Sequence, residues 1–153
     1  GYAGELGHVR VSSSGALDSA GFAGTLEAEV TRAELLDALR LPGADAAEFE
    51  AALLADRSEA VAAIVGRQLG HLGTALAAAI NLFNPEVVAL GGFLAALHAY
   101  DPQRLEQVVA EAALAPSREG VRITPAELGP NLLMIGAAGL AFGPLLDDPA
   151  SIS

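Results

Sequence analysis

The sequence predicts a single α/β domain, and three observations support this fold class. Short segments rich in β-branched residues alternate with longer segments of helical periodicity, as they do where helices connect parallel strands. Hydrophobic residues make up 52% of the 153 residues, enough to build a buried core. Aromatic residues make up only 5%, so Ala, Leu, Val and Ile must fill that core, which favours closely packed helices.

The first part of the chain predicts a strand, a loop and helical segments. Residues 6–11 alternate weakly between apolar and polar side chains, which indicates a short strand. Residues 18–24 are small and glycine-rich, and we expect an irregular loop there. The pattern from residue 25 to 39 is helical, and Thr31 and Glu34 have the spacing of a capping box.

A turn at residues 41–43 separates this region from a helix predicted at 45–55. Ser58 is a suitable N-cap for a long helix over 59–82. Three glycines in that helix are expected to let a neighbouring element approach closely: Gly66, Gly70 and Gly73. Its predicted apolar face consists of Val61, Ile64, Val65, Leu69, Leu72, Leu76 and Ile80.

Asn84 and Pro85 should end the long helix, because proline lacks the backbone donor and pushes the preceding residue out of helical geometry. The elements predicted beyond it are a buried strand at 87–90, a helix at 101–114, a strand at 121–124 and an apolar helix at 132–146. This order predicts at least one pair of parallel strands.

Composition excludes several classes of partner. The net charge is −11 and the eight Lys and Arg residues are scattered, so we expect no nucleic-acid-binding surface on this segment. There is no cysteine for a disulfide or a thiolate metal site. The most apolar stretch, residues 69–83, is shorter than the roughly 20 residues that span a bilayer, and no secretory signal is visible. We therefore expect a cytoplasmic protein without a membrane partner.

The densest group of polar residues is Glu5, His8 and Glu27, which lie in glycine-rich segments of the sequence. Two carboxylates and an imidazole can each hold a sugar hydroxyl in a directed hydrogen bond, although they could equally be surface charges. His71 and His98 are expected to be structural or exposed. The sequence contains no P-loop and no GxGxxG motif that would indicate other chemistry.

Three segments carry a resemblance to a known family. Residues 4–8, Gly-Glu-Leu-Gly-His, followed by residues 21–27, resemble the signature of the ROK family (repressor, open reading frame, kinase). Residues 80–92 are similar to that family's passage of helix, Asn-Pro, strand and Gly-Gly. Residues 135–138, Ile-Gly-Ala-Ala, are similar to its C-terminal Gly-Ala-Ala. The resemblance covers nearly the whole chain.

The resemblance implies a partial ribonuclease H-like lobe of the actin/hexokinase type, with helices packed on a small mixed sheet. Residues 1–146 would be the C-terminal part of a ROK lobe and residues 147–153 a frayed tail. By resemblance, Glu5, His8 and Glu27 hold sugar hydroxyls. Gly91 and Gly92 fall where kinase members approach the nucleotide, but a plain turn at the end of a strand is the favoured interpretation there.

The sequence departs from the family at its zinc site. In the family, zinc is bound by the motif's histidine and three cysteines, and here Asp18, Ala20 and Thr25 occupy the cysteine positions. One imidazole and one nearby carboxylate do not make the four-ligand shell of a structural zinc site. We therefore expect neither zinc nor another cofactor.

The resemblance also implies that the general base and the phosphate loops of ROK kinases would precede Gly1, so we expect no catalysis by this chain as it stands. The first hypothesis is the effector-binding and dimerisation part of a ROK-type transcriptional regulator, responding to a sugar or sugar phosphate and contacting DNA through an upstream domain. The second is a C-terminal fragment of an ATP-dependent ROK sugar kinase. The third is a structural domain that binds no ligand. A truncated sheet predicts homo-oligomers, because a free strand edge pairs readily with another copy.

Overall fold

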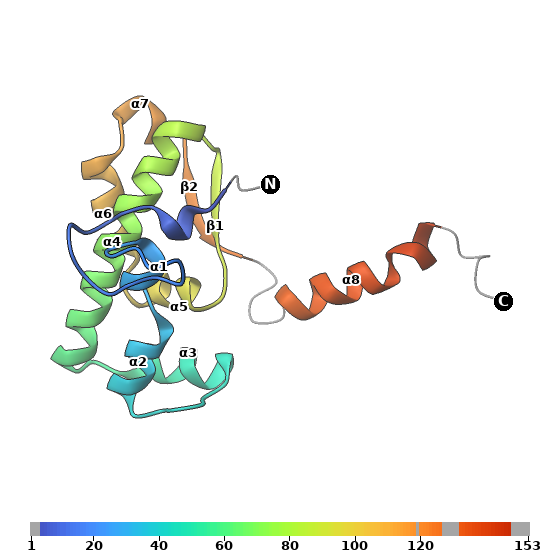
Figure 1. Cartoon of the computed structure of the whole chain (residues 1–153), viewed down its shortest axis with the longest axis horizontal. Helices are drawn as coiled ribbons and strands as arrows, with labels where there is room; N and C mark the ends of the chain where they lie inside the picture. Colours follow the sequence, from blue (N-terminus) through green and yellow to red (C-terminus); the bar gives the residue numbers. More distant parts are fainter. Residues whose placement is uncertain (1–3, 119, 127–131, 148–153) are drawn as a thin grey trace.

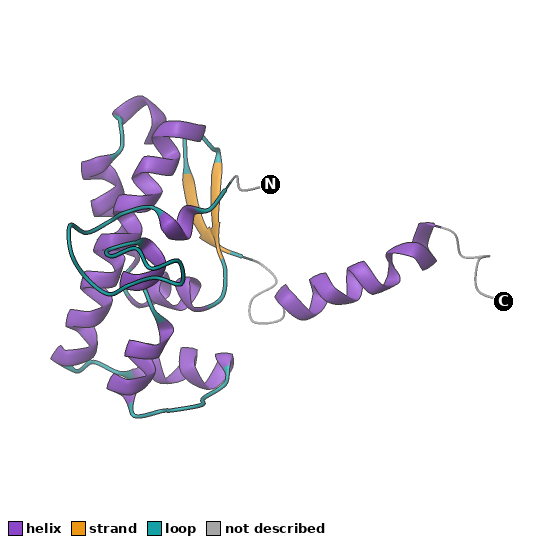
Figure 2. Ribbon diagram, in the orientation of Figure 1, coloured by secondary structure: helices purple, strands orange, loops and turns teal. Residues whose placement is uncertain are grey.

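The computed structural model describes residues 4–118, 120–126 and 132–147 of the chain. Helices dominate it, and two short strands lie side by side at one flank of the helical body (Figure 2). The elements in chain order are η1 (Leu6–His8), α1 (Leu26–Glu29), α2 (Arg32–Leu39), α3 (Ala46–Ala55), α4 (Glu59–Phe83), β1 (Val87–Leu90), α5 (Phe93–Tyr100), α6 (Pro102–Ala112), α7 (Ala115–Arg118), β2 (Arg122–Pro125) and α8 (Leu132–Asp147).

The sheet confirms the predicted parallel pair. β1 and β2 run parallel, with Val87 opposite Arg122 and Leu90 opposite Pro125. In the part of the chain that the structure describes, antiparallel pairing is limited to isolated bridges at Arg10–Thr25 and Leu17–Ala23, so the described sheet is parallel rather than mixed. The fold class is α/β, as predicted.

The prediction that residues 87–90 form a buried strand was right in its bounds and wrong in its burial. Leu90 is 3% exposed, but Val87 is 44% exposed. The reason is that β1 has one strand neighbour among the described residues, and its other edge is left without a strand partner there. A fully buried strand needs neighbours on both edges and cover on both faces.

The long helix α4 is the centre of the body, and it runs along the length of the helical body in Figure 1. The Ser58 hydroxyl accepts a hydrogen bond from the Val61 N–H, and Asn84 ends the helix with a left-handed φ of 46°. The predicted apolar face is buried apart from Ile64, which is partly buried. Each fully buried aliphatic side chain contributes roughly 1.5–3 kcal/mol to folding, so this face is a main source of stability.

Of the three α4 glycines, Gly73 alone is closely approached by another described element. A Cβ on Gly73 would lie 2.5 Å from Val108 Cγ1 of α6, so the close approach of α4 and α6 requires glycine there. A Cβ on Gly66 or Gly70 would meet no atom of the described residues within 4 Å, so the predicted close packing is not found at those two positions in the described structure. Sequence periodicity does not reveal which side of the helix the partner takes.

The capping box predicted at Thr31 and Glu34 does not form, because Glu34 is hydrogen-bonded to another helix. The Thr31 side chain makes no capping hydrogen bond. Instead Glu34 accepts hydrogen bonds from Arg67 and from the buried Gln68, whose Nε2 also donates to the Thr31 carbonyl at 3.0 Å. Glu34 therefore links α2 to α4 and is not available for its own helix terminus.

The N-terminal segment also differs from the prediction, because residues 6–11 do not form a strand. Gly4 adopts a φ of +89°, and the Leu6 N–H donates to the Gly4 carbonyl at 2.8 Å, which turns the chain into the single-turn helix η1. Extended pairing is reduced to the bridge between Arg10 and Thr25. The turn brings His8 beside the glycine-rich loop.

The C-terminal helix α8 has the bounds that its apolar pattern predicts, with Asp147 added at its end. Figure 1 shows α8 extending away from the helical body. The remainder of the predicted tail, residues 148–153, lies outside the described residues. No helix among the described residues combines the length and the apolar character needed to cross a membrane.

Candidate functional site

The site lies on the glycine-rich loop between η1 and α1, which passes in front of α4 in the view of Figure 1. The N–H groups of Val11 and Ser12 both donate to the Gly24 carbonyl, at 2.9 and 3.0 Å, and close the loop. Gly24 has a φ of +70°, and a Cβ there would collide with the Ser12 carbonyl oxygen. Glycine at this position is therefore required by both conformation and space.

Asp18 is the most connected side chain of the loop. Its carboxylate is fully inaccessible to solvent, and Oδ2 lies 3.0 Å from His8 Nδ1. Oδ1 accepts hydrogen bonds from the N–H groups of Ala20 and Phe22, at 2.9 and 2.8 Å. Burial raises the pKa of Asp18, but the hydrogen bonds from His8 and these N–H groups outweigh it and lower the pKa to about 2. Asp18 is therefore a carboxylate near neutral pH.

His8 ends η1 and is about one third exposed, with a side-chain exposure of 34%. Its hydrogen bond to Asp18 raises its pKa above the ordinary value, burial opposes this, and the negative charges of Glu27, Asp18 and Glu5 raise the pKa further. Because Asp18 occupies Nδ1, Nε2 is the ring nitrogen available to a ligand.

Glu27 lies in the first turn of α1 and faces the same loop. Its Oε1 accepts two hydrogen bonds from Ser19, one from the backbone N–H at 2.9 Å and one from the hydroxyl at 2.6 Å. These hydrogen bonds lower the pKa of Glu27. A Cβ on Gly7 would lie 3.3 Å from Glu27 Oε2, so the absence of a side chain at residue 7 leaves room for the carboxylate.

The structure thus brings together two of the three predicted sugar-binding residues and adds a third group. His8, Asp18 and Glu27 each offer a ligand-type atom, and these atoms all lie within 4.8 Å of one another. Glu5 immediately precedes η1 and is exposed, and its charge acts on His8. In the sequence, Asp18 stands out only as the replacement of a family cysteine. Its spacing to two loop N–H groups is the local signal that identifies it as an acceptor.

The other predicted positions lie elsewhere in the fold. Gly91 and Gly92 form the turn between β1 and α5, and Gly92 has a φ of +56°. His71 on α4 lies 3.9 Å from a carboxylate oxygen of Glu29, and His98 on α5 has its Nε2 buried with no hydrogen-bond partner among the described residues. Neither histidine belongs to the His8 cluster, and their structural or exposed role stays a prediction.

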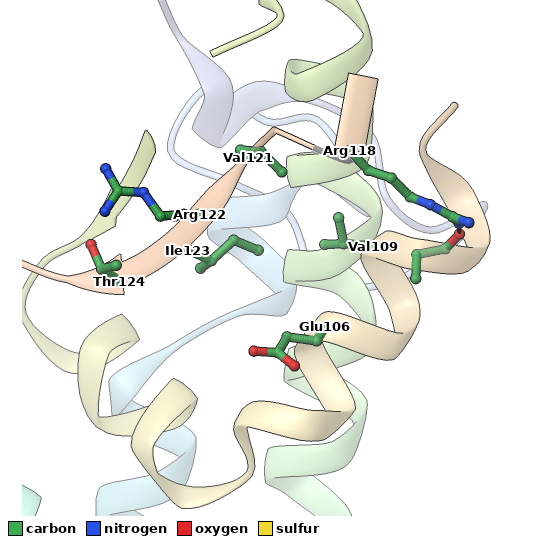
Figure 3. A pocket seen from close by; sticks show the side chains of 8 residues that line it. Glu106, Val109, Arg118, Val121, Arg122, Ile123 and Thr124 are labelled. Atoms are coloured by element: carbon green, nitrogen blue, oxygen red, sulfur yellow. Dashed lines mark hydrogen bonds between the residues drawn. The ribbon is translucent and has the colours of Figure 1, made fainter. Parts of the chain in front are cut away.

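An open groove of about 560 Å³ lies between α6, α7 and β2 (Figure 3). Its lining is mixed, with Val109 and Ile123 beside Glu106 and Arg122. The Arg118 guanidinium donates to the Ala110 carbonyl at the end of α6, so this cation already has a partner. The described polar side chains of the groove do not converge on one point. Those of the loop do, so the loop is the candidate site.

The comparisons with known proteins agree with the motifs. A protein-family model described as ROK family matches residues 1–143. The fold is similar to the crystal structure of a ROK family transcriptional regulator described as a homologue of the E. coli MLC protein, with a TM-score of 0.63 and 24% identity. The match covers 80% of this chain and 34% of that chain, so this chain spans about one third of the regulator's length. A search of curated proteins found no match.

Proposed function

Because the chain belongs to the ROK family, we propose that it is the sugar-binding and dimerisation part of a ROK-type transcriptional regulator and is not catalytic by itself. The observation that carries this proposal is the loop cluster, in which His8 is joined to Asp18 at 3.0 Å and lies beside Glu27. The similarity in fold to a solved ROK regulator supports the choice of a regulator.

The cluster has the chemistry that a sugar or sugar phosphate requires. Glu27 uses Oε1 for Ser19 and keeps Oε2 for a ligand hydroxyl, while His8 offers Nε2 as donor or acceptor. Glu5, exposed next to them, is the third contact expected from the family signature. A ligand with several adjacent hydroxyls satisfies such a set of directed partners better than an apolar ligand does.

Titration calorimetry on the full-length parent protein tests this assignment with glucose, N-acetylglucosamine and xylose. We expect one of them to bind, and we expect His8→Ala or Glu5→Ala to weaken its binding at least tenfold. Glu50→Gln, an exposed change on α3, is the matched control and should leave the affinity unchanged. Equal affinities for all four proteins would show that the site is elsewhere.

The alternative is a fragment of an ATP-dependent ROK sugar kinase. The glycine turn at Gly91 and Gly92, where a strand ends before the helix α5, is the feature that favours it. A coupled assay for phosphorylated sugar with the full-length parent and ATP separates the two proposals. Turnover that is abolished by His8→Ala would identify a kinase.

Dimerisation is proposed from the sheet. The edge of β1 that does not face β2 carries no strand among the described residues, and Val87 on β1 is 44% exposed. A free edge of this kind pairs with a strand of another copy. Light scattering at tens of micromolar protein should give a mass above the monomer, and Val87→Lys should reduce it, because an edge lysine opposes strand pairing. Monomers for both proteins would contradict this.

A further inference from the structure

We propose that Asp18 holds the loop in the place of the family's zinc, so that a metal-free network of hydrogen bonds positions His8 and Glu27. In this proposal Asp18 is a positioning residue, because its side chain is fully inaccessible and cannot touch a ligand. We call the hydrogen bonds between His8 and Asp18 and from Ser19 to Glu27 the tether. The tether shapes the loop itself and does not depend on whether a sugar binds.

The residues present do not fit a zinc ion. A structural zinc site has four ligands in a tetrahedron, supplied by Cys and His. At the three cysteine positions of the family, Ala20 has no ligand atom, and Thr25 carries a hydroxyl and is 2% exposed. Asp18 remains, and both of its oxygens already have hydrogen-bond partners.

Glu27 does not complete a metal shell either. It contributes the third atom of the cluster, but its Oε1 accepts from both the N–H and the hydroxyl of Ser19. A metal ion at the centre would have to displace the hydrogen bond between His8 and Asp18, and only Oε2 of Glu27 would be left to bind it. Hydrogen bonds within the protein already hold Asp18 and Oε1 of Glu27 in place, so the loop keeps its shape without the zinc ligands.

The network reproduces the connectivity that zinc would supply. The hydrogen bond between His8 and Asp18 joins η1 to the loop across ten residues, and those from Ser19 join the loop to α1 across eight. Asp18 and Ser19 are adjacent in sequence, so one short segment holds the side chains of both His8 and Glu27. Hydrogen bonds with one ionised partner are about twice as strong as neutral ones, which suits a replacement for metal ligation.

Two measurements on the intact chain test the tether. Protein purified without chelator should contain far less than one zinc per chain by mass spectrometry of metals, and EDTA should leave its melting temperature unchanged. In Asp18→Ala, the amide hydrogens of Ala20 and Phe22 should exchange at least tenfold faster than in the wild type, because both lose their acceptor.

Asp18→Asn separates the tether from a general loss of folding. Its side-chain carbonyl still accepts from the two N–H groups, so their exchange should stay within about threefold of wild type, while the NMR signals of the His8 ring shift. Glu50→Gln should change neither readout. Stoichiometric metal in the purified protein, a fall in melting temperature with EDTA, or unchanged amide exchange in Asp18→Ala would each overturn the proposal.

Discussion

The helical body and the N-terminal loop are held together in different ways. Around α4, stability comes from apolar side chains such as Leu69 and Phe49, which are 0% and 1% exposed. The loop is held by hydrogen bonds, some between backbone groups, such as those to the Gly24 carbonyl, and others from backbone and side-chain donors to Asp18 and Glu27. Packing is non-directional and tolerates small shifts, whereas hydrogen bonds fix the directions of individual atoms. The body therefore supplies the free energy of folding and the loop supplies the geometry of the site.

The largest effect should come from a cavity in the body. Leu69→Ala removes a fully buried side chain and should lower the free energy of unfolding by about 2–5 kcal/mol, measured by denaturant titration. Leu82→Ala on the same helix is the control, because Leu82 is 77% exposed and the change should cost less than about 0.5 kcal/mol. Similar losses for the two variants would contradict the described orientation of α4.

A pair of glycine substitutions in α4 should have smaller effects of opposite sign. Gly73→Ala forces a Cβ against Val108 of α6 and should destabilise the protein by about 1–3 kcal/mol. Gly70→Ala meets no described atom within 4 Å, and should stabilise the protein by up to about 1 kcal/mol through helix propensity. Thermal unfolding of both variants measures the difference, and destabilisation by Gly70→Ala would show that α4 packs differently.

The loop should respond to pH in a way that the apolar contacts of the body do not. The pKa of Asp18 is lowered to about 2, so its contribution to stability is present above its ordinary pKa near 4 and is lost as the pH falls towards 2. The pKa of His8 is raised, so its contribution is present below about 6.5 and is lost as the pH rises through its folded-state pKa.

The loop should therefore be held most firmly between about pH 4 and 6.5. NMR titration of the His8 ring measures this window, with Asp18→Asn as the variant in which the raised pKa should return towards its ordinary value. A His8 pKa that is equal in both proteins would exclude the link to Asp18.

The smallest effect is expected at Ser19. Ser19→Ala removes one of the two donors to Glu27 Oε1 and keeps the backbone N–H. At this exposed position the loss should be about 0.5 kcal/mol, and any sugar affinity of the parent should fall about twofold. Calorimetry with the sugar found for the parent measures it. A loss as large as that in His8→Ala would mean that the hydroxyl contacts the ligand directly.

The sequence alone predicted the features that are encoded by neighbouring residues. Ser58 and the Asn84-Pro85 pair gave the bounds of α4 to within one residue, and residues 87–90 form the predicted strand. Caps, helix-breaking residues and periodicity act over a few positions, so one sequence suffices to read them. The family signature likewise grouped His8 with Glu27, and the structure places both in the loop cluster.

Only the tertiary structure decided which distant groups meet. Glu34 accepts a hydrogen bond from α4 instead of capping its own helix, and Gly73, not Gly70, lies against α6. Residues 6–8 form η1 instead of a strand. The tertiary structure also placed Asp18 against His8, a pairing that the glycine-rich sequence does not predict. A local pattern constrains the conformation of its own segment, but a hydrogen bond or a packing contact depends on the partner that the rest of the fold brings into reach.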